Sequence, residues 1–206
     1  MIKKLLRPAY AIFKKNREFR RFKKALQANK GELKVVVGSS DIFEAGWIPS
    51  EWHFLNLLKE EEWLTYFKED SISNILAEHV WEHLTPEDGI IAIRTCYRFL
   101  KKGGRLRIAV PDAFHPDPTY IDYVKPGGTG AGADDHKILY SYKIMTDILE
   151  QVGYKVQLLE YFNESGAFHH NAWDAKEGYI HRSIKNDKRN ADGKPNYTSL
   201  IVDAVK

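Results

Sequence analysis

Two histidines and a glutamate occur within five residues, in the run His79-Val80-Trp81-Glu82-His83. This His-x-x-Glu-His spacing binds zinc when both histidines share one helical face and the glutamate activates a metal-bound water. Here the apolar residues from 72 to 77 predict a strand that ends just before His79, and Thr85-Pro86 predicts a helix that begins only after His83. We therefore expect a loop or short turn without a bound metal. A zinc hydrolase acting through His79, Glu82 and His83 is the minor alternative.

A second group of polar side chains follows in the stretch from Ala113 to Asp135, which is rich in Pro, Gly, Asp and His. Loops of this length in a compact domain are usually functional or disordered. At its end, the two acids and the histidine of Asp134-Asp135-His136 could bind a sugar hydroxyl, remove its proton or hold a divalent cation. The plainer alternative is that Asp134-Asp135 caps a helix running from about His136 to Val152.

These groups are positioned by a predicted strand, helix and strand between Ile72 and Asp112. Thr85 supplies an N-cap for the helix, and Pro86 is its first residue. The helix continues through apolar residues at spacings of three and four, and Gly103-Gly104 ends it. The second strand then begins at Leu106. Such a βαβ unit implies parallel strands joined by a right-handed crossover.

Three short motifs in this unit match a known family. They are Glu82-His83-Leu84 after the first strand, Lys101-Lys102-Gly103-Gly104 before the second, and Pro111-Asp112 at its end. On these residues the chain resembles class I S-adenosylmethionine-dependent methyltransferases, with Lys102 in place of the family's proline. The likeness continues through residues 132–137 and 197–200, where it resembles a bacterial group of predicted methyltransferases linked to surface-polysaccharide assembly.

The resemblance implies an α/β fold, a Rossmann-like three-layer sandwich around a mostly parallel seven-stranded sheet whose last strand is antiparallel. The first strand is expected at 33–37, and only the nine residues of 38–46 separate it from Trp47-Ile48. A parallel crossover normally needs a dozen or more residues, so we expect the first crossover helix to be shortened or absent. The last strand is expected at 197–205. It follows a hydrophilic link, 163–196, that either helps select the acceptor or is a solvated loop.

The resemblance also implies S-adenosylmethionine as cofactor, bound at the carboxyl ends of the strands. The turn after the first strand would pass under the methionine part, although the family usually has a second glycine where this chain has Ser40. Glu51 would accept hydrogen bonds from the ribose hydroxyls, its alternative being an ordinary surface glutamate, and Asn56 would lie at the adenine. The expected cofactor-binding residues are Gly38, Ser39, Ser40, Glu51, Asn56, Glu78 and His79.

The activity implied is methyl transfer to an oxygen of a glycan or related small acceptor, with the stretch 113–135 as a substrate lid. The expected substrate-binding residues are Asp112, His115 and Asp134. Because a hydroxyl acceptor needs a base, we assign that role to Asp135 or His136. The departure at Ser40 leaves an alternative from a different class, a catalytically inactive scaffold or binding protein that kept the fold.

Positive charge is concentrated at the amino end. Residues 1–30 hold eleven Lys or Arg and the single acid Glu18, a net of +10, which leaves −7 for residues 31–206. Pro8 can open a helix whose apolar residues include Phe19, Phe22 and Leu26. We expect a basic amphipathic N-terminal helix at 1–30 and a methyltransferase domain at 31–206. The pattern predicts either that residues 1–28 lie on an anionic membrane or that the helix packs on this domain.

The composition limits the number of domains, the cellular compartment and the kinds of partner that we expect. A chain of 206 residues with 43% hydrophobic content suits one α/β domain. Cys96 is the only cysteine, so no intramolecular disulfide is possible and a reducing cytoplasm is expected. If the N-terminal helix lies on a membrane, we expect peripheral attachment to its inner face. No specific nucleic-acid partner is expected.

Overall fold

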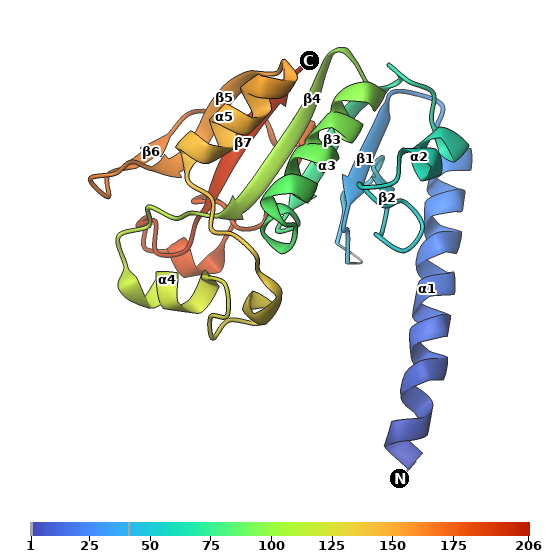
Figure 1. Cartoon of the computed structure of the whole chain (residues 1–206), viewed down its shortest axis with the longest axis horizontal. Coiled ribbons are helices and arrows are strands. Elements are labelled where there is room, and N and C mark those ends of the chain that lie inside the picture. The colour runs from blue at the N-terminus through green and yellow to red at the C-terminus, as the bar shows by residue number, and fades with distance from the viewer. Residues whose placement is uncertain (1, 41) are drawn as a thin grey trace.

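The computed structural model describes residues 2–40 and 42–206, with side chains from Tyr10 onward. Met1, Asp41 and the side chains of 2–9 lie outside this part, so the predicted basic surface of 1–28 is followed only from Tyr10. Seven strands form one sheet in the order β2-β1-β3-β4-β7-β5-β6 (Figure 1). The strands are β1 (Leu33–Val37), β2 (Ile48–Pro49), β3 (Ile72–Glu78), β4 (Leu100–Pro111), β5 (Lys155–Phe162), β6 (Phe168–His170) and β7 (Ser199–Val205).

The directions of the strands confirm the mostly parallel sheet. β1 pairs in parallel with both β2 and β3, and β3 pairs in parallel with β4. β7 lies antiparallel between β4 and β5, as expected for the last strand. The short β6, which the sequence analysis did not predict, adds a second antiparallel strand at the edge beside β5.

The start of the predicted crossover helix is confirmed. Helix α3 (Pro86–Phe99) is capped by Thr85, whose side chain accepts the Asp88 N–H at 3.2 Å. Its end was predicted wrongly, because β4 already begins at Leu100. That residue is fully buried and pairs with Ile72 of β3, so sheet pairing ends the helix and Gly103-Gly104 lies within the strand.

The next helices also differ from prediction. Helix α4 (Pro118–Val124) lies in the stretch expected to be irregular. Helix α5 (Tyr142–Val152) is capped by Ser141, whose hydroxyl accepts the Ile144 N–H, and so it does not begin near His136. The two acids proposed as its cap lie in a separate single-turn helix, η2 (Ala133–Asp135). The capping alternative for Asp134-Asp135 is therefore wrong.

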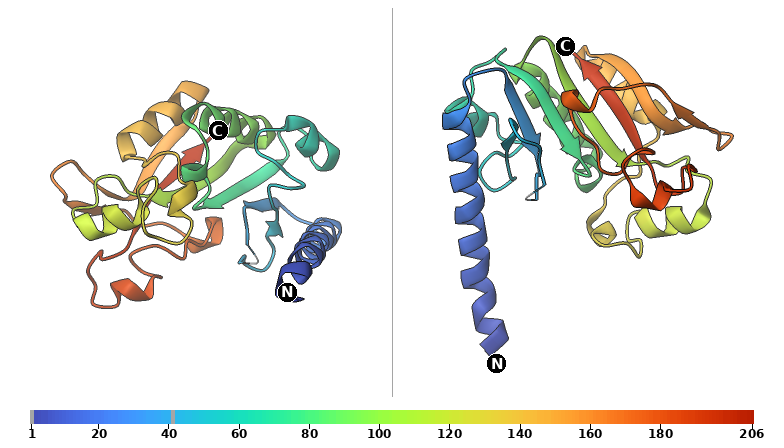
Figure 2. Two further views of the ribbon diagram at one scale, coloured as in Figure 1. Left: turned by 60° about the horizontal axis from the view of Figure 1, so that its bottom comes forward. Right: turned by 180° about the vertical axis from the view of Figure 1, so that it is seen from behind.

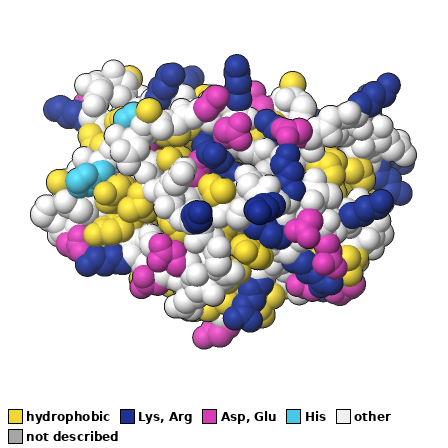
Figure 3. Space-filling model, turned by 90° about the horizontal axis from the view of Figure 1, so that it is seen from above, with side chains coloured by type: hydrophobic (Ala, Val, Ile, Leu, Met, Phe, Trp, Pro, Cys, Tyr) yellow, Lys and Arg dark blue, Asp and Glu magenta, His cyan; other side chains and the backbone are white. Residues whose placement is uncertain are grey.

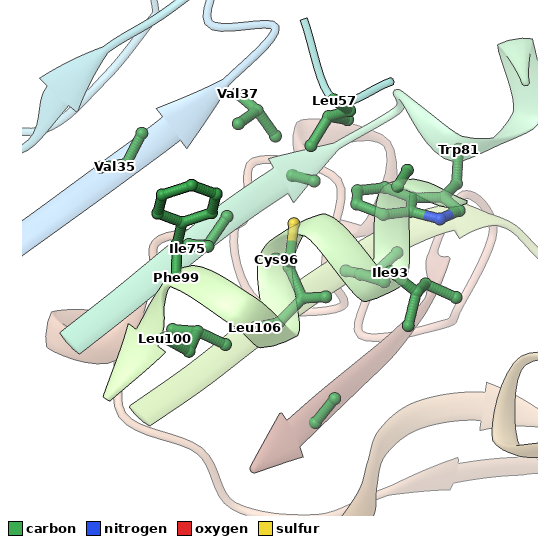
Figure 4. Packing of buried hydrophobic residues seen from close by; sticks show 14 of the residues in the cluster. Val35, Val37, Leu57, Ile75, Trp81, Ile93, Cys96, Phe99, Leu100 and Leu106 are labelled. Atoms are coloured by element: carbon green, nitrogen blue, oxygen red, sulfur yellow. The ribbon is translucent and has the colours of Figure 1, made fainter. Parts of the chain in front are cut away.

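Two layers cover the sheet. On one face, α3 and α5 bury the larger part of the core, where side chains of β1, β3 and β4 meet Ile93 and Cys96 of α3 (Figure 4). On the other face lies the chain between β6 and β7 (Figure 2), which buries Ile180 against Leu76 and Ala109. The predicted hydrophilic link is therefore not merely a solvated loop.

A buried ion pair fixes this second layer. Arg107 of β4 is fully buried and donates two hydrogen bonds to Asp203 of β7, at 2.7 and 2.8 Å. Its guanidinium also donates to the carbonyls of Asp174 and Gly178 and lies over the Trp173 ring. One cation thus joins two strands to the segment that covers them. At the end of the molecule where the parallel strands begin, by contrast, acidic and basic side chains are mixed on the surface (Figure 3).

The short connection after β1 contains no helix among its described residues, 38–40 and 42–47, as predicted. Helix α1 (Ile2–Ala28) and helix α2 (Glu60–Tyr66) lie at this edge of the sheet instead (Figures 1 and 2). Phe22 of α1 is fully buried, with ring centroids 5.1 Å from Phe54 and 4.8 Å from Tyr66. The interpretation in which Phe22 and its neighbours are free to enter a membrane is therefore wrong.

The remaining length of α1 extends past the carboxyl ends of the strands (Figure 1). Along it, Tyr10, Ile12 and Phe13 are 66%, 62% and 62% exposed. No helix in the described part of the chain is both long and apolar enough to cross a membrane.

Substitutions of two phenylalanines test whether α1 has a buried part and an exposed part. Phe22→Ala should reduce the free energy of unfolding by about 3–5 kcal/mol, because it leaves a cavity in an aromatic cluster. Phe13→Ala on the exposed part should change it by less than about 0.5 kcal/mol. Chemical denaturation of both variants measures the difference. If Phe22→Ala reduces the free energy of unfolding as little as Phe13→Ala does, α1 does not belong to the core.

Candidate functional site

A cleft of about 630 Å³, here called the α1 cleft, opens beside the carboxyl ends of β1 and β3. Helix α1 forms one wall with Lys14, Lys15 and Glu18. The turn after β1, the segment 51–58 and residues 79–84 form the others, and Asp135 reaches it from η2. A second pocket of about 370 Å³, the sheet-face pocket, meets it at Gly38, Ser40 and His79 and extends under His181.

The turn at Gly38 has the backbone geometry of a close-approach site. Gly38 has φ +63°, and a Cβ there would lie 2.8 Å from Cγ2 of Val80. Ser40, in the place of the family's second glycine, also has a left-handed φ of 45°. The chain therefore keeps the turn conformation at both positions, at a cost of about 1–2 kcal/mol for the non-glycine residue. Ser40 thus adopts a backbone conformation that glycine favours.

Glu51 holds this turn in place. Its Oε1 accepts the Ser40 N–H at 2.7 Å and the Ser39 hydroxyl at 2.9 Å. The side chain is only 9% exposed, and burial raises the pKa of its carboxyl above the ordinary value. Its second oxygen, Oε2, has no hydrogen bond among the described residues and remains available to a ligand hydroxyl. Glu51 is thus not an ordinary surface glutamate.

Asn56 lines the α1 cleft within a tightly bonded loop. Its Oδ1 accepts the Leu58 N–H at 2.8 Å, and its carbonyl accepts the indole N–H of Trp63 at 2.9 Å. The loop is therefore fixed before any ligand arrives. The adjacent Leu57 presents an apolar side chain to the same cleft.

Glu78 and His79 end β3 in different surroundings. Glu78 lines only the sheet-face pocket, where it accepts the N–H groups of His181 and Arg182 at 3.0 and 2.8 Å. Burial alone would raise its pKa, but these bonds and the His181 ring lower it overall. His79 lies between both pockets with a left-handed φ of 56°, and its Nε2 is 3.0 Å from the Ser199 hydroxyl.

Two of the predicted substrate-binding residues face neither pocket. Asp112 is fully buried, and its two oxygens accept the N–H groups of Phe114 and Phe162 at 2.9 and 2.8 Å. It therefore joins the end of β4 to β5. His115 is also buried, with its Nε2 3.2 Å from the Pro195 carbonyl and its ring stacked on Tyr120. Burial lowers the pKa of His115. We correct both assignments to structural roles.

The two predicted base candidates lie next to one another but differ in access. Asp135 lines the α1 cleft, where its Oδ1 accepts a hydrogen bond from Lys137 at 2.8 Å. That bond lowers the pKa of Asp135. His136 points its Nδ1 at the Val124 carbonyl, 2.7 Å away, and does not line the cleft. Asp134 is exposed on η2.

The sequence analysis missed His83 as a site residue. Its ring lines the α1 cleft, with Nδ1 3.4 Å from Asp135 Oδ2 and its centroid 4.8 Å from that of His136. The signal was the His-x-x-Glu-His run itself. Only a single helical turn, η1 (Trp81–His83), forms there, which confirms the predicted short turn and removes the shared helical face that the peptidase arrangement requires. The cleft residues that α1 contributes were also missed, because no signal in the local sequence indicates where that helix packs.

No family model and no curated protein matches this sequence. A solved structure from Thermotoga maritima, a SAM-dependent methyltransferase described as a possible histamine N-methyltransferase, is 14% identical over 100% of both chains, with a TM-score of 0.51. A SAM-dependent methyltransferase from Archaeoglobus fulgidus is 16% identical over 91% of this chain and 92% of its own, with a TM-score of 0.48. The Thermotoga structure confirms the predicted Rossmann-like methyltransferase fold.

Asp112 makes stability depend on pH. Burial raises its pKa from 3.8 to about 6, so the folded chain holds this proton more tightly than the unfolded chain does. The stabilisation is therefore fully present below pH 3.8 and is lost as the pH rises from there to about 6. Relative to Asp112→Asn, the wild type should lose about 3 kcal/mol of unfolding free energy between pH 3 and 7. A difference between the two proteins that does not vary with pH would contradict the assignment.

Proposed function

We propose that the chain is an S-adenosylmethionine-dependent methyltransferase that methylates an oxygen of a glycan or related small acceptor. The observation that carries this proposal is the left-handed turn at Gly38–Ser40, held by Glu51 at the carboxyl ends of parallel strands. In open α/β sheets this edge is where ligands bind. The fold and the sequence motifs support the same activity.

The residues around the α1 cleft fit the cofactor. A glycine whose Cβ would collide with Val80 leaves backbone uncovered for a ligand's close approach, and the Ser39-Ser40 segment lies beside it. Oε2 of Glu51 can accept from a ribose hydroxyl, and Leu57 offers an apolar surface to a base. Glu78 and His79 would then border the cofactor from the end of β3.

Bound S-adenosylmethionine supplies a methyl group on a positively charged sulfur. An acceptor hydroxyl that takes this methyl group would give its proton to Asp135. The protein's part is alignment, exclusion of water and acceptance of that proton. Asp135 is the candidate base that lies on the cleft wall, and Asp134 beside it is free to bind the acceptor.

Calorimetry with S-adenosylmethionine and S-adenosylhomocysteine tests the proposal. The wild type should bind both, and Gly38→Val should lose binding because a branched side chain would fill the turn. Ser40→Gly should bind at least as tightly, since glycine adopts the same φ without strain. Thermal melting establishes that both variants fold. Absence of binding to the wild type would favour the inactive scaffold, and normal binding by Gly38→Val would place the cofactor elsewhere.

The second part of the proposal is that α1 attaches the protein to an anionic membrane on its cytoplasmic face. The apolar residues for this contact are Tyr10, Ile12 and Phe13, which are exposed among basic residues such as Lys14 and Lys15. Basic residues near such a surface each contribute about 1 kcal/mol. Because Lys14 and Lys15 also line the α1 cleft, attachment would bring the cleft close to a lipid-linked acceptor.

Vesicle sedimentation tests this attachment. The full chain should bind vesicles rich in anionic phospholipid at low salt, and binding should weaken as salt screens the charges. Phe13→Ser should reduce binding, whereas Ile91→Ser, which alters an exposed residue of α3, should not. Equal binding to neutral and anionic vesicles, or none to either, would contradict the proposal.

A further inference from the structure

Three potential metal ligands converge beside the α1 cleft, and one of them, His83, lines it. Glu82 and His83 come from η1, and His136 follows η2. One ligand atom of each lies within 4.8 Å of the other two. Segments more than fifty residues apart in the sequence thus bring one carboxylate and two imidazoles to a single point.

Glu82 is the strongest indication that this point binds a ligand. Its side chain is completely buried, and neither carboxylate oxygen has a hydrogen-bond partner among the described residues. His79 Nδ1 lies 2.9 Å from Oε1, but the atoms are not oriented for a hydrogen bond. A buried carboxylate without hydrogen bonds is costly, and metal coordination is one of the few ways to compensate it.

Both histidines are oriented as metal ligands usually are. His136 directs Nδ1 at the Val124 carbonyl, 2.7 Å away, and because a carbonyl only accepts, Nδ1 carries the proton and Nε2 is free to bind. His83 Nδ1 lies 3.4 Å from Asp135 Oδ2, which favours the same tautomer. In metal sites the second ring nitrogen commonly donates to such a carbonyl or carboxylate, which fixes the ring and its tautomer.

We propose that Glu82, His83 and His136 bind a divalent transition metal ion such as Zn²⁺. Two imidazoles and one carboxylate suit zinc and its neighbours better than Mg²⁺ or Ca²⁺, which prefer oxygen ligands. Three protein ligands leave a coordination position open. This set differs from the His-x-x-Glu-His motif, because His136 replaces His79.

The metal site is inferred from the positions of its three ligands alone. Only its role in methyl transfer rests on the proposed function. His83 and Asp135 both line the α1 cleft, so an acceptor hydroxyl in the cleft could reach the open position. A bound metal ion makes such a hydroxyl more acidic. Asp135, on the cleft wall, could then accept the proton.

Zinc content and competition with a chromophoric chelator test the site, using full-length protein without an affinity tag. The wild type should bind one equivalent of Zn²⁺, and Glu82→Gln and His136→Ala should each weaken binding at least about 100-fold. His170→Ala, which leaves the three ligands and their contacts intact, should stay close to wild type, and His79→Ala should weaken binding less than His136→Ala does. Zn²⁺ should raise the melting temperature of the wild type and not that of Glu82→Gln.

Melting curves in chelator establish whether each variant folds. Glu82→Gln should fold well because it removes a buried charge whose oxygens accept no hydrogen bond among the described residues. Failure of the wild type to bind Zn²⁺, or binding that needs His79 and not His136, would overturn the inference. These measurements contain no S-adenosylmethionine. Zinc binding without cofactor binding would therefore refute the proposed function alone.

Discussion

The shortness of the chain between β1 and β2 is the constraint on which much of this structure depends. The ten residues from 38 to 47 are too few for a crossover helix, so no helix amino end follows β1 among the described residues to fix its turn. A side chain does this instead, because Glu51 accepts both the Ser40 N–H and the Ser39 hydroxyl. Burial raises its pKa, and those two bonds favour its charged form. The carboxylate thus replaces part of what a helix would supply.

The missing helix also leaves an edge of the sheet to be covered, and α1 covers it. Phe22 enters an aromatic cluster with Phe54, Tyr66 and Phe67, so α1 and the short α2 pack together beside β2. Of the side chains of α1 that the structure describes, from Tyr10 onward, only Glu18 and Phe22 are buried. Helix α1 also forms a wall of the α1 cleft, and the same helix therefore completes the core and shapes the site.

The sequence predicted those helix and strand boundaries that depend on residues close by in the chain. Strand β1 and the start of α3 at Thr85-Pro86 were found from an apolar run and a cap. The end of α3 was not, because it depends on Leu100 pairing with Ile72. Likewise, Asp112 has a structural role only because Phe162, fifty residues later, donates to it. A residue type predicts possible chemistry, whereas its partners decide whether the group is available.

The same distinction explains the acids and histidines of the predicted lid. Asp135 and His136 were singled out as adjacent in sequence, but their side chains have different partners. Asp135 is held by Lys137 and faces the cleft, whereas His136 faces Glu82 and His83 from behind η2. The motif His-x-x-Glu-His likewise separates, because the left-handed backbone at His79 and the single turn of η1 prevent a common helical face. Its glutamate and second histidine instead meet His136, since Lys137 N–H donates to the Glu82 carbonyl and fixes the two segments side by side. A backbone hydrogen bond between two loops thus decides which of the potential ligands can act together.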